Sequence, residues 1–201
     1  MKVVTLHPGA FEQACAELAQ RCFDWRPDLL IGIRAGGYVV AEAMRSALGD
    51  EAPPLLPITR QRASTHAKQN SRFIRRVLPH LPYSVTDRLR VLEHRALTSR
   101  HKPAEPPHWE PDHQELVQLQ AQLHGTPSHR ILVIDDAVDT GTTLCAVMDI
   151  VHQLAPAAQL RSAAIVQSTP QPAIVPNYVL HTRQLCRFPW SHDFKPTRPA
   201  L

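Results

Sequence analysis

The chain has 201 residues, of which 43% are hydrophobic and 20% charged, and its formal net charge at pH 7 is +4. This length and apolar content fit a single domain, residues 1–201, with a hydrophobic core of its own. The sequence has no run of about 18 apolar residues, which excludes a membrane-spanning helix, and its first eight residues lack the apolar stretch of a secretion signal, so we expect a cytoplasmic protein.

The first part of the chain alternates between helical and strand patterns. The expected elements are a helix over 9–23, a strand over 29–33, a helix over 38–46 and a strand over 55–59. Pro57 favours an edge position for the last of these strands, or a shortened strand. Cys15 and Cys22 lie on the apolar stripe of the first helix, and the four cysteines form no C-x-x-C pair, which indicates packing rather than a metal site or a disulfide.

The positive charge is concentrated in the next segment. Residues 60–102 include eleven Lys or Arg but only two Asp or Glu, a balance of +9, so the remaining residues together have a net charge of −5. A charge concentrated in this way needs a local explanation. The pattern favours helices at about 71–79, 85–98 and 112–124, and we expect residues 60–128 to form a basic insertion at one edge of a sheet.

The last third of the chain returns to alternating strands and helices. Strands are expected over 131–134, 162–166 and 177–180, with a helix after the first of them. Strands that alternate with helices are typical of a mainly parallel sheet covered by helices on both faces.

The most informative motif is Ile131–Thr143, an apolar strand followed by two acids and a turn rich in Asp, Thr and Gly. The carboxyl end of such a strand, just before a helix, is where α/β sheets bind ligands, and the free N–H groups of the helix favour a phosphate. Asp135 and Asp136 suit hydroxyl groups or a metal ion. An acidic pair at the strand end that caps a helix or meets solvent, and an ordinary N-cap at the turn, remain open as alternatives.

Ile131–Thr143 resembles the phosphoribosyl-pyrophosphate (PRPP) motif of the type I phosphoribosyltransferases. The resemblance implies that Asp135 and Asp136 hold the ribose hydroxyls of magnesium-bound PRPP and are the metal-site candidates. It also implies that a loop holds the 5′-phosphate, and that Asp139 in this loop lies near the acceptor base and accepts its proton. The phosphate-binding candidates are Asp139, Thr140, Gly141, Thr142 and Thr143.

Two further segments resemble the pyrophosphate-binding parts of this family. Arg34-Ala35-Gly36-Gly37 follows the first core strand, where family members wrap the leaving pyrophosphate and often have a non-proline cis peptide; the corresponding bond here joins Arg34 and Ala35. The family's mobile loop corresponds to 59–70, and its cations Arg60, Arg62 and Lys68 suit pyrophosphate. A solvated basic loop is the alternative.

The C-terminal part resembles the purine branch but departs from it at base-recognition positions. Gln167 stands where hypoxanthine- and guanine-using members have a lysine that contacts the C6 oxygen of the base. Leu185 replaces the aromatic residue that stacks on the base in the xanthine-guanine type. The resemblance therefore implies base contacts from Gln167 and from Phe188 or Trp190, with simple packing of the chain end as the alternative for Trp190.

The resemblance implies an α/β type I phosphoribosyltransferase fold, with a helical insertion and a small hood made from the two ends of the chain, its C-terminal part at about 167–201. The implied reaction transfers 5-phosphoribosyl from PRPP, with Mg²⁺, to a nucleobase-like acceptor, with a purine favoured as in purine salvage. A homo-oligomer is expected. Two alternatives remain: an enzyme of a specialised pathway with a non-purine acceptor, and a PRPP-sensing regulator that binds nucleic acid. The regulator would use a group of basic residues: Arg72, Arg75, Arg76, Arg88, Arg90 and Arg95.

Overall fold

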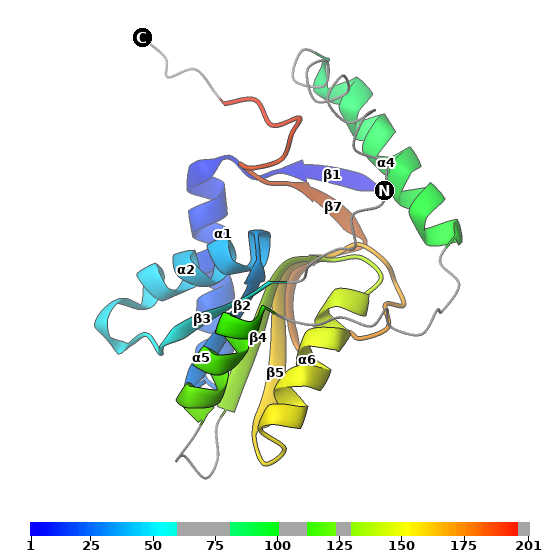
Figure 1. Cartoon of the computed structure of the whole chain (residues 1–201). Helices are drawn as coiled ribbons and strands as arrows, with labels where there is room; N and C mark the ends of the chain where they lie inside the picture. Colours follow the sequence, from blue (N-terminus) through cyan, green and yellow to red (C-terminus); the bar gives the residue numbers. More distant parts are fainter. Residues whose placement is uncertain (60–80, 101–111, 124–129, 197–201) are drawn as a thin grey trace.

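The computed structural model describes residues 1–59, 81–100, 112–123 and 130–196 (Figure 1). The helix expected over 71–79 and the candidate pyrophosphate ligands Arg60, Arg62 and Lys68 lie outside the described residues.

A central sheet of five parallel strands forms the middle layer of the molecule. Its strand order is β3-β2-β4-β5-β6. The strands are β2 (Leu29–Arg34), β3 (Leu55–Thr59), β4 (Arg130–Val138), β5 (Gln159–Gln167) and β6 (Tyr178–Thr182). The edge position predicted for the strand with Pro57 is confirmed, because β3 is the first strand in the sheet order and, among the described residues, pairs with β2 alone.

Helices cover both faces of this sheet, as predicted, and each pair encloses one hydrophobic core (Figure 1). On one face pack α1 (Pro8–Phe23) and α2 (Gly36–Leu48), which leads into a short 3₁₀ helix, η1 (Gly49–Glu51); on the other pack α5 (His113–Leu123) and α6 (Thr142–Leu154). Leu132 and Ile134 of β4 belong to the first core, whereas Ile131 and Val133 belong to the second. This explains why β4 begins as an unbroken apolar run: both of its faces are buried.

The two ends of the chain form the predicted hood, a second sheet of two parallel strands. β1 (Lys2–Thr5) pairs with β7 (Gln184–Arg187), and α4 (Tyr83–Arg100) lies beside them (Figure 1). The C-terminal boundary differs from the predicted one at about 167, because β6 is an edge strand of the central sheet and the hood strand begins only at Gln184. The expected insertion thus contributes helices at two places, with α5 beside the edge strand β3 and α4 beside the hood.

Arg187 joins the hood to α4. Its side chain is only 1% exposed, and its guanidinium donates hydrogen bonds to the hydroxyls of Thr5 in β1 and Thr86 in α4, at 2.7 and 3.0 Å. It also donates to Asp193 at 2.9 Å. A buried guanidinium requires such partners, so this residue fixes where α4 sits on the hood.

Cys15 and Cys22 of α1 are 0% and 1% exposed. These two residues pack in the core, as predicted, and burial raises the pKa of their thiols to about 12. All four cysteines are free.

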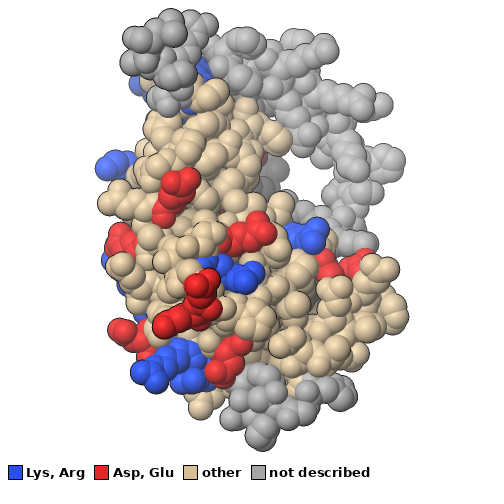
Figure 2. All heavy atoms as spheres, turned by 90° about the vertical axis from the view of Figure 1, so that its left-hand side faces the viewer, with Lys and Arg blue, Asp and Glu red and all other residues tan. Residues whose placement is uncertain are grey.

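Within the described ranges, no helix is both long and apolar enough to cross a membrane. On the face seen in Figure 2, acidic and basic side chains are intermixed rather than gathered by sign.

Candidate active site

The predicted residues 34–37 and 135–143 lie at the carboxyl ends of β2 and β4, two neighbouring strands. From β2 the chain continues through α2 to β3, on one side of β2, whereas β4 pairs with the other side. The connections therefore leave this pair of strands in opposite directions, and such a switch point is where open α/β sheets have their ligand crevice. The candidate site lies at this point.

Residues Arg34–Gly37, which we call the cis loop, pack directly against the two acids of β4. The peptide bond between Arg34 and Ala35 is cis, as the resemblance implied. A Cβ on Gly36 would overlap the carboxyl group of Asp136, and one on Gly37 would lie 2.7 Å from the Cα of Asp135. Glycine at both positions is what allows the loop and the acids to approach this closely.

Asp135 and Asp136 belong to β4 itself, which continues to Val138, four residues beyond the expected end of the strand. The extension follows from pairing with β5, since Asp135 lies opposite Ala164 and Ala137 opposite Val166. Asp135 is 9% exposed, and its Oδ1 accepts a hydrogen bond from the Asp136 N–H at 2.9 Å. Asp135 is therefore buried at the carboxyl end of a central strand, whereas Asp136 beside it is half-buried.

Burial and mutual repulsion make the acidic pair electrostatically unfavourable by itself. Burial, and then the adjacent negative charge of Asp136, raise the pKa of Asp135 well above its usual range. Burial also raises the pKa of Asp136, although hydrogen bonds from its surroundings, including one from the Trp190 side chain, partly oppose the shift. Two buried carboxyls in this state are stabilised by a cation or by hydroxyl donors.

Residues Asp139–Thr143, which we call the phosphate loop, lead from β4 into α6. Gly141 is the N-cap residue of α6, with φ +78°, and no side-chain oxygen caps the helix. The loop is held by a hydrogen bond from the Ala173 N–H to the Thr140 carbonyl at 2.7 Å. The alternative of an ordinary side-chain N-cap is therefore wrong, and the N-terminus of α6, whose dipole favours an anion, directly follows the phosphate loop.

The Asp139 side chain is 57% exposed and is approached by two residues that the sequence analysis did not single out. Its Oδ1 accepts a hydrogen bond from the Ser168 hydroxyl, which follows β5, and lies 3.9 Å from Nδ1 of His94 in α4. The spacing of Thr86, Arg90 and His94, four residues apart on one helical face, is the one local signal that could have indicated a buried polar stripe.

Of the three candidate base-binding residues, Gln167 and Phe188 are buried and Trp190 is accessible. Gln167 is 7% exposed, and its Nε2 donates to the Thr169 carbonyl at 2.8 Å. Phe188 is 4% exposed and stacks under Trp190, with ring centroids 4.9 Å apart and planes at 5°. Trp190 is 37% exposed. Of the two stacked rings, it is the one that lies next to Asp136.

Glu115 of α5 is a further residue that the sequence analysis missed. Its carboxylate accepts hydrogen bonds from the N–H and hydroxyl of Thr59 at 2.5 and 2.7 Å, at the end of β3. Its Oε1 also lies 3.6 Å from Nε of Arg34 in the cis loop. Glu115 thus ties the insertion to both strand ends on the pyrophosphate side of the candidate site.

The residues of the site fit a hard divalent cation in part. No three His, Cys, Asp or Glu side chains gather at metal-binding distances anywhere in the described ranges. Two adjacent carboxyl groups still suit Mg²⁺, which prefers oxygen ligands and usually keeps waters and substrate oxygens in its coordination shell. Asp135 and Asp136 would be the protein's contribution.

The fold is a doubly wound α/β architecture, and the candidate site lies at its switch point. The phosphoribosyl transferase domain family matches residues 5–193, and the chain belongs to this family. It has the type I phosphoribosyltransferase fold.

Solved structures with the same fold are only distantly related in sequence. A purine phosphoribosyltransferase from Pyrococcus horikoshii Ot3 matches with a TM-score of 0.59 and 22% identity over 100% of both chains. A xanthine-guanine-hypoxanthine phosphoribosyltransferase from Helicobacter pylori matches with a TM-score of 0.54 and 15% identity, over 94% of this chain and 93% of the other. A Neisseria gonorrhoeae protein with bound ppGpp matches with a TM-score of 0.58 and 14% identity, over 94% and 89%. No curated protein matches the chain.

Proposed function

We propose that the protein transfers the 5-phosphoribosyl group from PRPP to a ring nitrogen of a nucleobase-like acceptor, with a purine favoured, and releases pyrophosphate. It would act as a cytoplasmic, homo-oligomeric pentosyltransferase. The observation that carries this proposal is the packing of Asp136 against Gly36, because it joins the expected ribose-binding acids to the expected pyrophosphate loop in one crevice.

The acidic pair would bind the ribose. Asp135 and Asp136 would accept hydrogen bonds from the 2′- and 3′-hydroxyls, and together with the substrate they would hold Mg²⁺. When bound, Mg²⁺ would supply positive charge next to the pyrophosphate oxygens. The raised pKa of both carboxyls supports this assignment, since donors or a cation would compensate the cost of their burial.

The two helix N-termini would bind the two anionic ends of PRPP. The amides of the phosphate loop and α6 would hold the 5′-phosphate, and those of Gly36 and Gly37 at the start of α2 would hold the pyrophosphate. Arg34, whose side chain is 53% exposed, would add a charge-assisted contact to the pyrophosphate. Arg60, Arg62 and Lys68 remain candidates for the same role.

In the reaction, the lone pair of the acceptor nitrogen would form the bond to C1′ of the ribose. The C1′–O bond would break, its electron pair would leave with the pyrophosphate, and the proton displaced from the acceptor would pass to Asp139. Amides and cations aimed at the departing group lower the barrier because they stabilise the charge that develops there.

Trp190 and Gln167 would form the acceptor side of the site. Trp190 is accessible and borders Asp136, so its ring could lie against a planar base, whereas Phe188 is buried behind it and would support the ring. An amide at position 167 can both donate and accept, unlike an ammonium group, which only donates. This difference, and Leu185 in β7, keep a specialised non-purine acceptor as the alternative.

The test is a screen of nucleobases and related ring amines with PRPP and Mg²⁺, read out as pyrophosphate release. We expect release with at least one acceptor and loss of release when the metal is chelated. Binding of PRPP without turnover of any acceptor would overturn the enzymatic proposal and favour the regulator.

One contact bears on the nucleic-acid-binding alternative. Arg90, one of the six arginines assigned to that role, donates to Asp193 and to the Cys186 carbonyl, so its charge is committed within the protein. Nucleic-acid binding measured against salt concentration would test the alternative, because phosphate contacts predict a steep loss of affinity as salt rises.

A further inference from the structure

Helix α4 packs against the hood with a polar face. Thr86 is 1% exposed and His94 8%, and both lie on the same face as Arg90, since the three are spaced four residues apart. On other sides of the helix Val85, Leu89 and Leu92 are 41–58% exposed. An amphipathic helix normally buries the apolar face, so the buried polar face of α4 requires partners that make its burial favourable.

Two of these three residues fix the rotation and the position of α4. Arg90 donates hydrogen bonds from Nε and Nη2 to the Asp193 carboxylate, the first at 2.8 Å, and from Nη1 to the Cys186 carbonyl. The Thr86 hydroxyl accepts a hydrogen bond from Arg187 at 3.0 Å. Arg187 and Asp193 are 1% and 4% exposed. Because breaking a buried ion pair is costly, α4 cannot turn or slide without losing these bonds.

The third residue, His94, is held by this anchoring next to the phosphate loop. Its Nδ1 lies 3.9 Å from Oδ1 of Asp139, the same oxygen that accepts the Ser168 hydroxyl. The distance exceeds a direct hydrogen bond, so the contact between the imidazole and the carboxylate is a close polar approach rather than a hydrogen bond. Among the described residues, no hydrogen bond or ion pair involves Oδ2 of Asp139, and the side chain is 57% exposed.

We infer that His94 is a positioning residue for phosphoribosyl transfer, a role that rests on the proposed function. His94 and Ser168 hold Oδ1 of Asp139 from the protein side, so that Oδ2 faces the crevice. Oδ2 then receives the proton that leaves the acceptor nitrogen when this nitrogen bonds to C1′ and the pyrophosphate departs with the electron pair. The inserted helix thereby supplies part of the acceptor side of the site.

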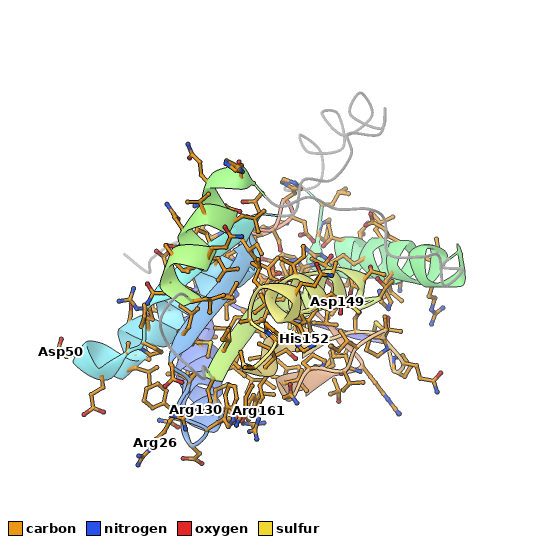
Figure 3. The ribbon with its side chains drawn as sticks, turned by 60° about the horizontal axis from the view of Figure 1, so that its bottom comes forward. Arg26, Asp50, Arg130, Asp149, His152 and Arg161 are labelled. Carbon is orange, nitrogen blue, oxygen red and sulfur yellow. The ribbon has the colours of Figure 1, made fainter. Side chains whose placement is uncertain are left out.

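The first experiment measures the contact itself and requires no activity. Ring ¹⁵N resonances of His94 are compared between the full-length wild-type protein and Asp139→Asn. We expect the Nδ1 resonance of His94 to shift. The control is His152, an exposed residue in the last turn of α6 (Figure 3), and its resonance should stay unchanged. An unchanged His94 resonance overturns the inference.

The second experiment measures the role in catalysis with two variants whose side chains have the same branched shape. An asparagine places an amide nitrogen close to the position of Nδ1, whereas a leucine places no donor there. We expect His94→Leu to lower kcat about tenfold or more, the scale of losing an orienting partner, with KM for PRPP unchanged, and His94→Asn to retain most of kcat. His152→Gln is the control and should match the wild type.

The outcomes separate the inference from the proposed function. Full kcat in folded His94→Leu, or equal losses in His94→Leu and His94→Asn, overturns the positioning role while the transferase function stands. In the Asp139→Asn background, His94→Leu should have no further effect, and an additive loss would also contradict action through Asp139. A wild-type protein inactive with every acceptor overturns the proposed function, and the positioning role fails with it.

Discussion

The carboxyl group of Asp136 occupies the space that a side chain at position 36 would need. A Cβ on Gly36 would overlap this group and would lie 2.7 Å from Oδ1, well inside van der Waals contact. The relationship joins the cis loop after β2 to the acidic pair in β4, and it makes the proposed PRPP site sensitive to a single methyl group.

Gly36→Ala is therefore expected to displace the Asp136 carboxylate and to weaken PRPP binding at least tenfold, or about 1.4 kcal/mol. The fold should tolerate the change, because alanine is favoured in the first turn of α2 and the obstructed group is the end of a side chain. Calorimetric titration with PRPP measures the effect. Gly9→Ala in α1 is the matched control, since a Cβ there meets nothing within 4 Å. Equal affinities in the two variants would refute the assignment.

Replacing both acids, in Asp135→Asn with Asp136→Asn, should abolish PRPP binding and leave the fold intact. Folded-state pKa values raised by burial mean that each ionised carboxyl destabilises the folded state once the pH exceeds the pKa of the unfolded chain. The uncharged double variant should therefore have a free energy of unfolding at neutral pH at least as large as that of the wild type. Thermal unfolding and PRPP titration measure the two effects, and wild-type PRPP affinity would show that the site is misassigned.

Glu115→Ala should destabilise the protein by about 1–3 kcal/mol, because the backbone N–H and the hydroxyl of Thr59 both lose their acceptor. Glu115→Gln keeps one oxygen and should retain more than half of this stability. Denaturant unfolding measures both, with Gln118→Ala, an exposed position on the same helix, as the control. A loss of 1 kcal/mol or more in the control would assign the effect to helix α5 in general rather than to Thr59.

The hood should carry an acid-sensitive contribution to stability. Burial alone would raise the pKa of Asp193, but hydrogen bonds and charges from Arg90 and Arg187 outweigh it and lower the pKa from 3.8 to about 2. A lowered folded-state pKa contributes stability above the unfolded value, here about 2 kcal/mol, which is lost as the pH falls from about 4 to about 2.

Asp193→Asn should consequently be less stable than the wild type at neutral pH, and the difference should shrink between pH 4 and pH 2. Unfolding followed over this pH range measures it. Asp50→Asn, at an exposed position away from the hood (Figure 3), should give a curve parallel to that of the wild type. A constant difference between wild type and Asp193→Asn would mean that the ion pairs with Arg90 and Arg187 do not form in solution.

Local patterns in the sequence were sufficient for most of the central sheet. The apolar run 131–134 and the turn behind it predicted a buried strand and a helix, and Pro57 predicted an edge strand, because burial on two faces and the missing N–H of proline act within a few residues. The extension of β4 through Asp135 and Asp136 was not predictable in this way. It depends on pairing with β5, more than twenty residues further along the chain.

The chain alone also specified which residue types stand at the crevice: two acids, a Gly-Gly pair after a strand, and a turn of Asp, Thr and Gly. Only the tertiary structure determined what the charges of the insertion and the C-terminus do. Arg187 and Asp193 are buried and, together with the partly buried Arg90, they hold α4 in the position that brings His94 to Asp139. The placement of α5 likewise brings Glu115 to Thr59. The physical reason is that burial and pairing of charged groups depend on contacts between residues up to 182 positions apart, as for Arg187 and Thr5, and local periodicity contains no information about them.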